Sequence, residues 1–316
     1  MLGLPLRKIQ TLGVDVVHGC QLRCIGCPNS SLKPDIRHMP PADFAACLGN
    51  LDVRAVKLFR LFNYGEPMLH PDLPGLLVII PRQRYRIRQV EISTNAQVHR
   101  FDMLAEVFKT GVLDTLVVSC DGDGTPGEYE RLRPPARWDR LLQFLARSRE
   151  LRDAYSPATR LMTRTICETP QGRRRWSDVL GPLGYVPEFR GWLYLSDAVG
   201  APCGPPLPAE NGMCVFLQQR TLFVDYDGTV VTCCCHPRAG MLGNLKESTY
   251  SQILAGPLRR RFLHRLETNR KAMPICGTCG IRRHEHKLEQ IFRWPYRWLS
   301  RTLRVKYTSA NGALAQ

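Results

Sequence analysis

Three closely spaced cysteines near the start of the chain constrain its structure more than any other feature. Cys20, Cys24 and Cys27 follow the pattern C-x3-C-x2-C, directly after an apolar run over residues 12–17 that predicts a strand. Thiolates are the side chains that best hold iron–sulfur iron, and they must converge from a short loop. Glycine and proline in and beside this run supply the bends. The pattern predicts an iron–sulfur loop with three ligands; buried or zinc-binding cysteines are the alternative.

The length and the lack of targeting signals limit the kinds of protein this chain can be. Its 316 residues suffice for one large domain or a core with a smaller module. The sequence has no run of about eighteen apolar residues, and residues 1–10 lack the pattern of a secretory signal. Thirteen cysteines without a leader favour reduced thiols and metal ligation over disulfides. We therefore expect a cytoplasmic protein without a transmembrane helix.

The chain is strongly basic, with a formal net charge of +16 that is carried mainly by arginine. Such charge can lie on a solvated surface without a specific partner, or it can attract an anionic substrate, an acidic protein or an anionic membrane. Residues 288–316 mix arginines with aromatic side chains. This composition suits an anionic membrane surface or an acidic partner, and equally a tail folded over the rest of the chain. Nucleic acid is not an expected partner, because no recognised binding motif for it is present.

Strands and helices alternate through the first two thirds of the sequence. Predicted strands cover residues 12–17, 53–62, 89–93, 114–120, 159–167 and 186–195, and predicted helices cover residues 40–48, 73–80, 101–109, 138–151 and 176–180. This alternation indicates about six βα units and a parallel sheet, which is an α/β fold. Polar and glycine-containing segments follow the strands, at the carboxyl ends where such folds collect their chemistry.

A second set of cysteines follows a proline-rich linker at residues 200–208. Residues 221–224 and 229–233 are predicted to form a β-hairpin around an Asp-Gly turn, and residues 250–266 predict a helix. The cysteines of this set are Cys214, Cys233, Cys276 and Cys279. Their spacing by itself is compatible with a four-cysteine zinc site. The C-terminal part is therefore predicted to be a small metal-binding module.

The first cysteine loop and the strand ends after it resemble the radical S-adenosylmethionine (SAM) enzymes. That family carries a Gly-Gly-Glu-Pro-like turn after its second strand, and Gly65-Glu66-Pro67 stands there, with Tyr64 in place of the first glycine. The residue before the third cysteine is often aromatic in the family and is Gly26 here. By this resemblance, the residues that contact SAM are Tyr64, Gly65, Glu66, Pro67, Ser93, Asn95, Ser119 and Arg133. The resemblance also implies a partial (β/α)6 barrel of the TIM type.

The resemblance implies a specific chemistry for the first loop. Members of this family bind SAM at the iron that lacks a protein ligand, so Cys20, Cys24 and Cys27 would hold a [4Fe-4S] cluster with SAM as the second cofactor. Reductive cleavage of SAM would give a 5′-deoxyadenosyl radical, which abstracts hydrogen from a substrate. The protein positions the substrate and excludes water and quenchers. An electron donor such as flavodoxin or ferredoxin is the implied partner.

The second cysteine set resembles the auxiliary-cluster module called SPASM, or its shorter twitch form. Gly228 and Cys233 satisfy the Gly-x4-Cys pattern of that module, and Gly243-Asn244 matches a segment that it often carries. No cysteine follows Cys279. The resemblance therefore implies one auxiliary [4Fe-4S] cluster, held by the four cysteines of this set, within a small module of β-hairpin and helix.

The run Cys233-Cys234-Cys235 leaves two questions open. Neighbouring residues on a strand point to opposite faces, so alternation alone cannot separate Cys233 from Cys235 as the ligand. The Gly-x4-Cys spacing favours Cys233. Cys234 and Cys235 are either inert neighbours or candidate catalytic residues that return a hydrogen atom to a product radical, as a cysteine does in some radical SAM epimerases.

Together these features predict a radical SAM core over residues 1–200, an auxiliary-cluster domain over 201–287 and a basic aromatic tail over 288–316. The predicted activity is that of a radical SAM oxidoreductase or isomerase, which oxidises or epimerises a small natural product or metabolite. A short segment before the first strand favours such a substrate over a peptide. A maturase of a ribosomally made peptide is one alternative, and a non-enzymatic zinc or iron–sulfur binding protein is another. Substrate identity and oligomeric state stay open at this point.

Overall fold

Ten strands form the main sheet of the structure, a computed structural model that describes residues 7–193, 195, 200, 210–218 and 220–279. The strands of the barrel run parallel, in the order β1 (Arg7–Val14), β4 (Val53–Arg60), β6 (Val90–Thr94), β7 (Thr115–Asp121), β8 (Arg160–Ile166) and β9 (Val186–Arg190). Within the described part of the chain, β9 pairs only with β8, so the ring of strands is not closed there. The predicted fold class, a partial (β/α)6 barrel, is confirmed.

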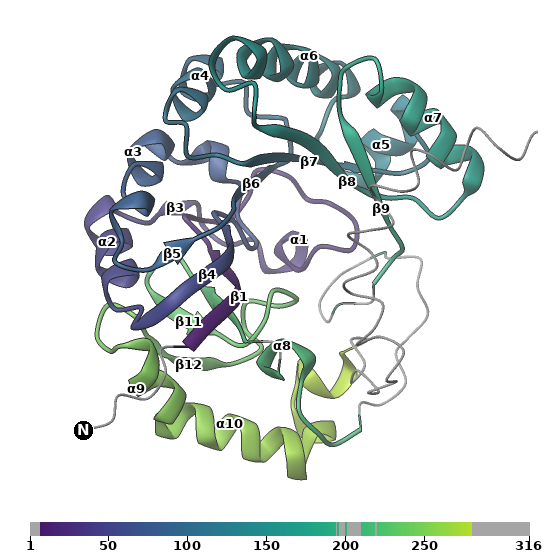
Figure 1. Cartoon of the computed structure of the whole chain (residues 1–316). Helices are drawn as coiled ribbons and strands as arrows, with labels where there is room; N and C mark the ends of the chain where they lie inside the picture. The colour runs from purple at the N-terminus through teal and green to yellow at the C-terminus, as the bar shows by residue number, and fades with distance from the viewer. Residues whose placement is uncertain (1–6, 194, 196–199, 201–209, 219, 280–316) are drawn as a thin grey trace, which may run out of the picture. The chain divides into compact units, whose positions relative to one another are not determined.

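Helices cover the outer side of this curved sheet (Figure 1). They are α2 (Pro41–Gly49), α3 (Leu73–Leu77), α4 (Phe101–Lys109), α6 (Trp138–Tyr155) and α7 (Pro170–Leu180), and they lie between consecutive parallel strands in the chain. The buried residues of α4 are Met103, Leu104, Val107 and Phe108, which lie on one helical face. Between α2 and β4, the rings of Phe44 and Phe59 meet edge to face. The hydrophobic core thus lies between the sheet and its helices.

Shorter elements complete this part of the chain. They are β2 (Val17–His18), β3 (Arg37–His38), β5 (Arg86–Ile87), α1 (Pro28–Leu32), α5 (Pro126–Leu132) and the 3-10 turns η1 (Pro67–Leu69) and η2 (Ile80–Arg82). The strand predicted over residues 12–17 is two strands, because β1 ends at Val14 and β2 pairs with β3 instead of continuing the sheet. The sequence analysis missed α5, which is short and begins at a proline.

Two predicted helices have different limits in the structure. The helix α7 begins six residues before the predicted residue 176, because the Thr169 side chain caps its first turn. The single helix predicted over residues 250–266 is two helices, α9 (Tyr250–Ala255) and α10 (Pro257–Thr268). Gly256 stands between them in an extended conformation, and Pro257 has no N–H with which to continue the first helix.

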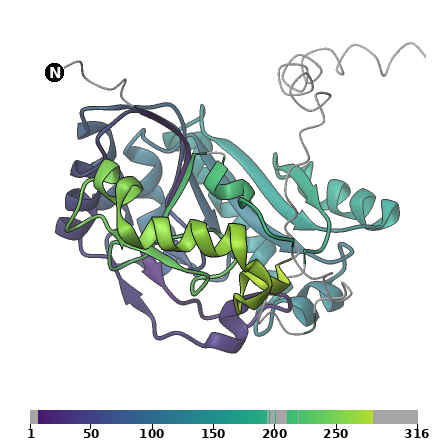
Figure 2. The same cartoon turned by 90° about the horizontal axis from the view of Figure 1, so that it is seen from below.

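The C-terminal hairpin extends the same sheet on the other side of β1. The strand β10 (Thr221–Val224) pairs in parallel with β1 and in antiparallel with β11 (Thr229–Val231), which pairs with β12 (Met241–Asn244). Gly228 closes the predicted Asp-Gly turn at a φ of 86°, where a Cβ would lie 2.7 Å from Asn244 Oδ1. The helix α8 (Val215–Gln218) precedes the hairpin, and α9 and α10 lie in front of it in Figure 2. The 3-10 turns η3 (Arg270–Ala272) and η4 (Cys276–Thr278) follow α10.

The remaining sequence features are the absence of a predicted transmembrane helix, the linker, the tail and the cysteines outside the two sets. No helix in the described ranges is both long and apolar enough to cross a membrane. Most of the predicted linker, residues 200–208, and the whole of the tail, residues 288–316, lie outside the described residues. Cys47, Cys120 and Cys167 belong to the hydrophobic core, so these three thiols pack the interior.

Candidate iron–sulfur sites

The first cysteine loop is held in place by its backbone. Ile25 N donates a hydrogen bond to the carbonyl oxygen of Leu132 at 2.8 Å, at the end of α5. Ser30 in α1 donates its hydroxyl to the Cys24 carbonyl oxygen at 2.6 Å. Gly26 has a φ of 78°, a region in which an aromatic side chain would be strained, which accounts for the departure from the family pattern. The helix that sequence reasoning missed, α5, is thus part of the support for the loop.

The three thiols of this loop lie close enough to act on one another electrostatically. Burial, with a smaller contribution from neighbouring thiols, raises the pKa of Cys20 to about 12 and that of Cys24 to about 11. Burial also raises the pKa of Cys27. Buried thiolates need a positive counter-charge, which cluster iron supplies. Among the described residues no three His, Cys, Asp or Glu side chains meet around a single-ion site. Since a four-iron cluster spreads its thiolates around several irons, this donor set fits such a cluster.

The predicted SAM turn, residues 63–67, is clamped by a buried aspartate that sequence reasoning did not single out. Asp15, which is 2% exposed, accepts hydrogen bonds from the backbone N–H groups of Tyr64 and Gly65, both at 2.9 Å. Burial, and then the charge of Asp225, raise the pKa of Asp15 to about 7. A Cβ on Gly65 would lie 1.7 Å from the Val17 carbonyl oxygen, so only glycine fits this turn. An aspartate inside the apolar run over residues 12–17 was the available signal.

Glu66 ties this turn to the first cysteine loop. Its backbone N–H donates to the Gly19 carbonyl oxygen at 3.1 Å. Its carboxylate accepts from the Thr94 hydroxyl at 2.6 Å and from Asn95 N at 2.7 Å, and burial raises its pKa to about 6. Asn95 in turn donates from Nδ2 to Cys20 Sγ at 3.4 Å. The Glu66 carboxylate therefore accepts its hydrogen bonds from groups of the protein. It holds Asn95 beside the thiol of Cys20.

Arg133 brings a buried positive charge to the same loop. It is 7% exposed and forms an ion pair with Asp121, at the end of β7. Its charge lowers the pKa of Cys24 and Cys27, although burial outweighs that effect. Among the other predicted cofactor contacts, Ser93 lies on β6 and Ser119 on β7. The predicted residues thus come from the carboxyl-terminal parts of neighbouring strands or from the loops after them, except Arg133, which follows α5.

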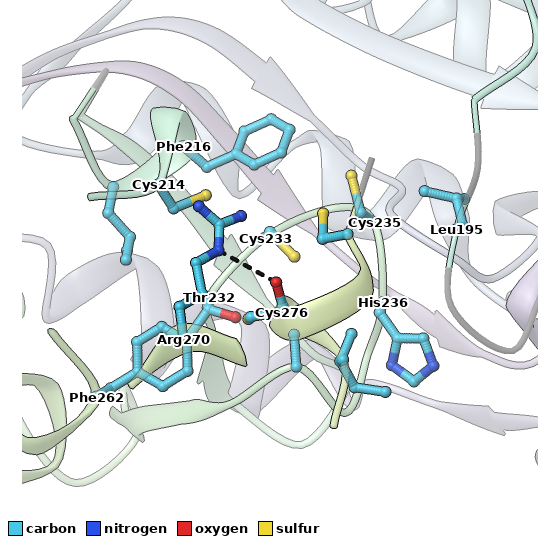
Figure 3. A pocket seen from close by; sticks show the side chains of 14 residues that line it. Leu195, Cys214, Phe216, Thr232, Cys233, Cys235, His236, Phe262, Arg270 and Cys276 are labelled. Atoms are coloured by element: carbon cyan, nitrogen blue, oxygen red, sulfur yellow. Dashed lines mark hydrogen bonds between the residues drawn. The ribbon is translucent and has the colours of Figure 1, made fainter. Parts of the chain in front are cut away.

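The second cysteine set lines a pocket that is partly open to solvent (Figure 3). Its lining includes all four predicted ligands, Cys214, Cys233, Cys276 and Cys279. Burial, followed by the charges of the other three thiols, raises the pKa of Cys276 to about 12. Thiols from three separate segments of the chain therefore meet at one place, which is a donor set that fits an iron–sulfur cluster.

The structure separates the three consecutive cysteines. Cys233 and Cys235 line the pocket, whereas Cys234 is not among the pocket residues in the described part of the chain. Interaction with the neighbouring Cys235 thiol lowers the pKa of Cys233. The same neighbour lowers the pKa of Cys234, and the charge of Arg60 at the end of β4 acts in the same direction. Two of the three consecutive thiols, Cys233 and Cys235, therefore lie in the pocket with the other cysteines of the set.

One hydrogen bond joins the SAM turn to the second pocket. The Tyr64 hydroxyl donates to the Cys233 carbonyl oxygen at 3.1 Å, and the tyrosine side chain is largely buried. Tyr64 occupies the position where the resemblance expects glycine, so the departure from the family pattern has a structural role here. The contact links the SAM turn to the cysteine run that lines the second pocket.

A parallel α/β barrel with a three-thiol loop after its first strand and a four-thiol pocket beside it defines an iron–sulfur protein. The sequence model described as the radical SAM superfamily matches residues 14–158, and the SPASM model, an iron-sulfur cluster-binding domain, matches residues 214–280. The chain belongs to the radical SAM superfamily and carries a C-terminal SPASM domain. Membership indicates an enzyme whose cofactors are SAM, a [4Fe-4S] cluster and auxiliary iron–sulfur centres.

Solved structures share this fold at low sequence identity. The structure of anSMEcpe with bound AdoMet and the Cp18Cys peptide matches with a TM-score of 0.59 and 13% identity, over 94% of this chain and 99% of its own. BtrN in complex with AdoMet and 2-DOIA matches with a TM-score of 0.53 and 16% identity, over 86% of this chain and 92% of its own. No curated protein matches the sequence at a significant level. At these identities the likeness concerns the fold.

Proposed function

We propose that this enzyme cleaves SAM reductively at the first cysteine loop and abstracts a hydrogen atom from a small-molecule substrate. The observation that carries the proposal is the contact between this loop and the SAM turn, in which Glu66 N donates to the Gly19 carbonyl oxygen at 3.1 Å. It brings three thiols and the turn together at the carboxyl ends of β1 and β4. That end of a barrel is where reactive groups collect.

The proposed roles of the residues follow from these contacts. Cys20, Cys24 and Cys27 would hold three irons of the cluster, which when bound and reduced supplies the electron that breaks a carbon–sulfur bond of SAM. The backbone of residues 64–67, held open by Asp15, would bind polar groups of SAM. The remaining proposed contacts of this cofactor are Ser93, Asn95, Ser119 and Arg133.

We propose one auxiliary [4Fe-4S] cluster in the second pocket, with Cys214, Cys233, Cys276 and Cys279 as its ligands. Cys233 is preferred to Cys235 because it satisfies the Gly-x4-Cys spacing from Gly228. An electron acceptor at this place would make the overall reaction an oxidation. In that case a substrate radical would lose one electron to a cluster in this pocket and one proton to a base, which leaves a new double bond.

Epimerisation is the second candidate outcome, and it requires a hydrogen donor. Of the two candidate catalytic cysteines, Cys234 suits this role better, because it is set apart from the pocket and lies near Arg60. Cys235 lies in the pocket itself, beside the proposed cluster ligands. Replacement of Cys234 by alanine would abolish a redox-neutral reaction and leave an oxidation intact.

The substrate class is proposed by analogy with the relatives of the same fold. BtrN is bound to the small molecule 2-DOIA and anSMEcpe to a peptide, and a peptide is our second candidate. The net charge of +16 suits an acidic electron donor, and we propose flavodoxin or ferredoxin in the cytoplasm. We propose domain limits of residues 1–200, 201–287 and 288–316, with the tail contacting an acidic partner or an anionic membrane.

An anaerobic assay tests this function. Reconstituted enzyme is incubated with SAM and dithionite, and 5′-deoxyadenosine is measured with and without candidate substrates. The proposal requires 5′-deoxyadenosine from the natural chain and none from the Cys24→Ala variant. Equal signals from the two proteins would refute it. One 5′-deoxyadenosine per product with no electron released would refute the oxidation and leave epimerisation.

A further inference from the structure

Arg270 is a buried cation in the second cysteine pocket. It begins η3, is 4% exposed and is one of the side chains that line the pocket. Its Nε donates to the Cys276 carbonyl oxygen at 3.1 Å, and its backbone N–H donates to Asn211 Oδ1 at 2.9 Å. Figure 3 shows the guanidinium reaching into the group of thiols, toward Cys214. Hydrogen bonds therefore hold both the backbone and the side chain of Arg270, and its guanidinium points toward the proposed cluster site.

The described residues offer this cation no carboxylate. No Asp or Glu within them forms an ion pair with Arg270, and none lines the pocket. A buried charge without a counter-charge costs several kcal/mol, so native proteins pair it. The groups that remain are the thiols, and the charge of Arg270 lowers the pKa of Cys214 and Cys276, although burial outweighs it. The balancing charge must then come from thiolates.

We propose that Arg270 is the counter-cation of the auxiliary cluster and raises its reduction potential. This inference rests on the auxiliary cluster of the proposed function. A cluster held by four thiolates carries net negative charge, and this charge grows by one unit on reduction. A fixed guanidinium nearby stabilises the reduced form more than the oxidised form.

The inference assigns Arg270 a place in the oxidation. The cluster that Cys214, Cys233, Cys276 and Cys279 would hold would accept the one electron that a substrate radical gives up when it also loses a proton to a base and forms a double bond. Arg270 lowers the free-energy cost of placing that electron in a buried pocket. Arg270 would not contact the reacting atoms. It would act through the cluster by changing its reduction potential, so it is a positioning residue and not a catalytic one.

The test compares Arg270→Gln and Arg270→Lys with the control Arg265→Gln, which removes an equal charge from the exposed end of α10. Midpoint potentials are measured by electron paramagnetic resonance on holoenzyme, with the auxiliary signal identified by its loss in Cys276→Ala. We expect Arg270→Gln to shift the reduced-to-oxidised ratio at least tenfold toward the oxidised form, about 59 mV for one electron. Arg270→Lys should retain most of the natural potential, and Arg265→Gln should retain all of it.

Each outcome decides the inference. Equal potentials in Arg270→Gln and Arg265→Gln, at equal iron content, overturn it. If Arg270→Gln cannot hold auxiliary iron, retention of iron by Arg270→Lys supports the need for charge. Loss of auxiliary iron in both Arg270→Gln and Arg270→Lys overturns the inference. It would show that the pocket depends on the hydrogen bond from Arg270 Nε to the Cys276 carbonyl oxygen and not on the charge. Absence of SAM cleavage in the natural chain would instead refute the proposed function, so the two failures are distinguishable.

Discussion

The two thiol sets differ in how the buried arginine beside each of them is neutralised. Arg133 beside the first loop is 7% exposed and paired with Asp121, so it adds little net charge there. Arg270 beside the second set is 4% exposed and, within the described residues, has only a carbonyl oxygen as its side-chain partner. A buried arginine that is already paired with a carboxylate changes a nearby reduction potential less than one without a carboxylate. The comparison indicates how the same type of residue would serve two clusters with different tasks.

The largest expected effect is the loss of SAM cleavage when a cysteine of the first set is replaced. Cys24→Ala should reduce SAM cleavage to background, because a cluster with two remaining ligands is not held. Iron content should fall from about eight to about four per chain. Cys47→Ala, which removes a core thiol of the sheet and helices, is the matched control and should keep both iron and cleavage. SAM cleavage by Cys24→Ala would break the distinction between the two sets.

The reciprocal change should spare the first site. Cys276→Ala should also leave about four irons, but it should retain 5′-deoxyadenosine formation in the absence of substrate. Formation of the oxidised product should be lost, since no acceptor is left for the electron. Iron analysis and product quantification on the same sample measure both effects. An unchanged yield of oxidised product would show that the second set is not the acceptor.

The paired arginine of the first site should matter for stability. Arg133→Leu leaves Asp121 buried without its partner and should lower the free energy of unfolding by about 3–5 kcal/mol. The double variant Arg133→Leu/Asp121→Leu should recover part of the loss, because it removes both charges. Denaturant unfolding measures the three proteins. Arg131→Leu, from an exposed pair with Glu128 on α5, should change stability little. A loss in that control as large as in Arg133→Leu would contradict the account.

The smallest effect concerns the contact between the sites. Tyr64→Phe removes the hydrogen bond to the Cys233 carbonyl oxygen and keeps the ring, so it should cost about 1 kcal/mol of stability. The same substitution at the half-exposed Tyr155 is the control and should be nearly neutral. Thermal unfolding of the iron-loaded proteins measures both. Identical melting temperatures for the two variants would remove the Tyr64 contact from the account.

Local signals predicted the parts of the fold that local physics controls. The helix α4 has the predicted limits because its apolar residues repeat at helical spacing and Gly111 follows it. The break at Gly256 and Pro257 was present in the sequence and was overlooked, so one helix was predicted instead of two. The four predicted thiols of the second set all line one pocket, and the assignment of both sets as cluster ligands stays a prediction.

Residues that act through distant partners could not be predicted in the same way. Asp15 binds the N–H groups of a turn about fifty residues later. The proposed role of Arg270 depends on a pocket that three separate segments of the chain form. Alternation alone did not separate Cys233 from Cys235, because both line that pocket. Such roles depend on tertiary contacts, which one sequence does not reveal.

The central claim is that one thiol set cleaves SAM and the other holds a second cluster. The direct measurement is iron, zinc and sulfide content of anaerobically reconstituted protein, with 5′-deoxyadenosine assayed on the same sample. The account predicts about eight irons and eight sulfides per chain, no zinc, and 5′-deoxyadenosine that depends on reductant. About four irons with one zinc would contradict the second cluster, and absence of 5′-deoxyadenosine would contradict the first.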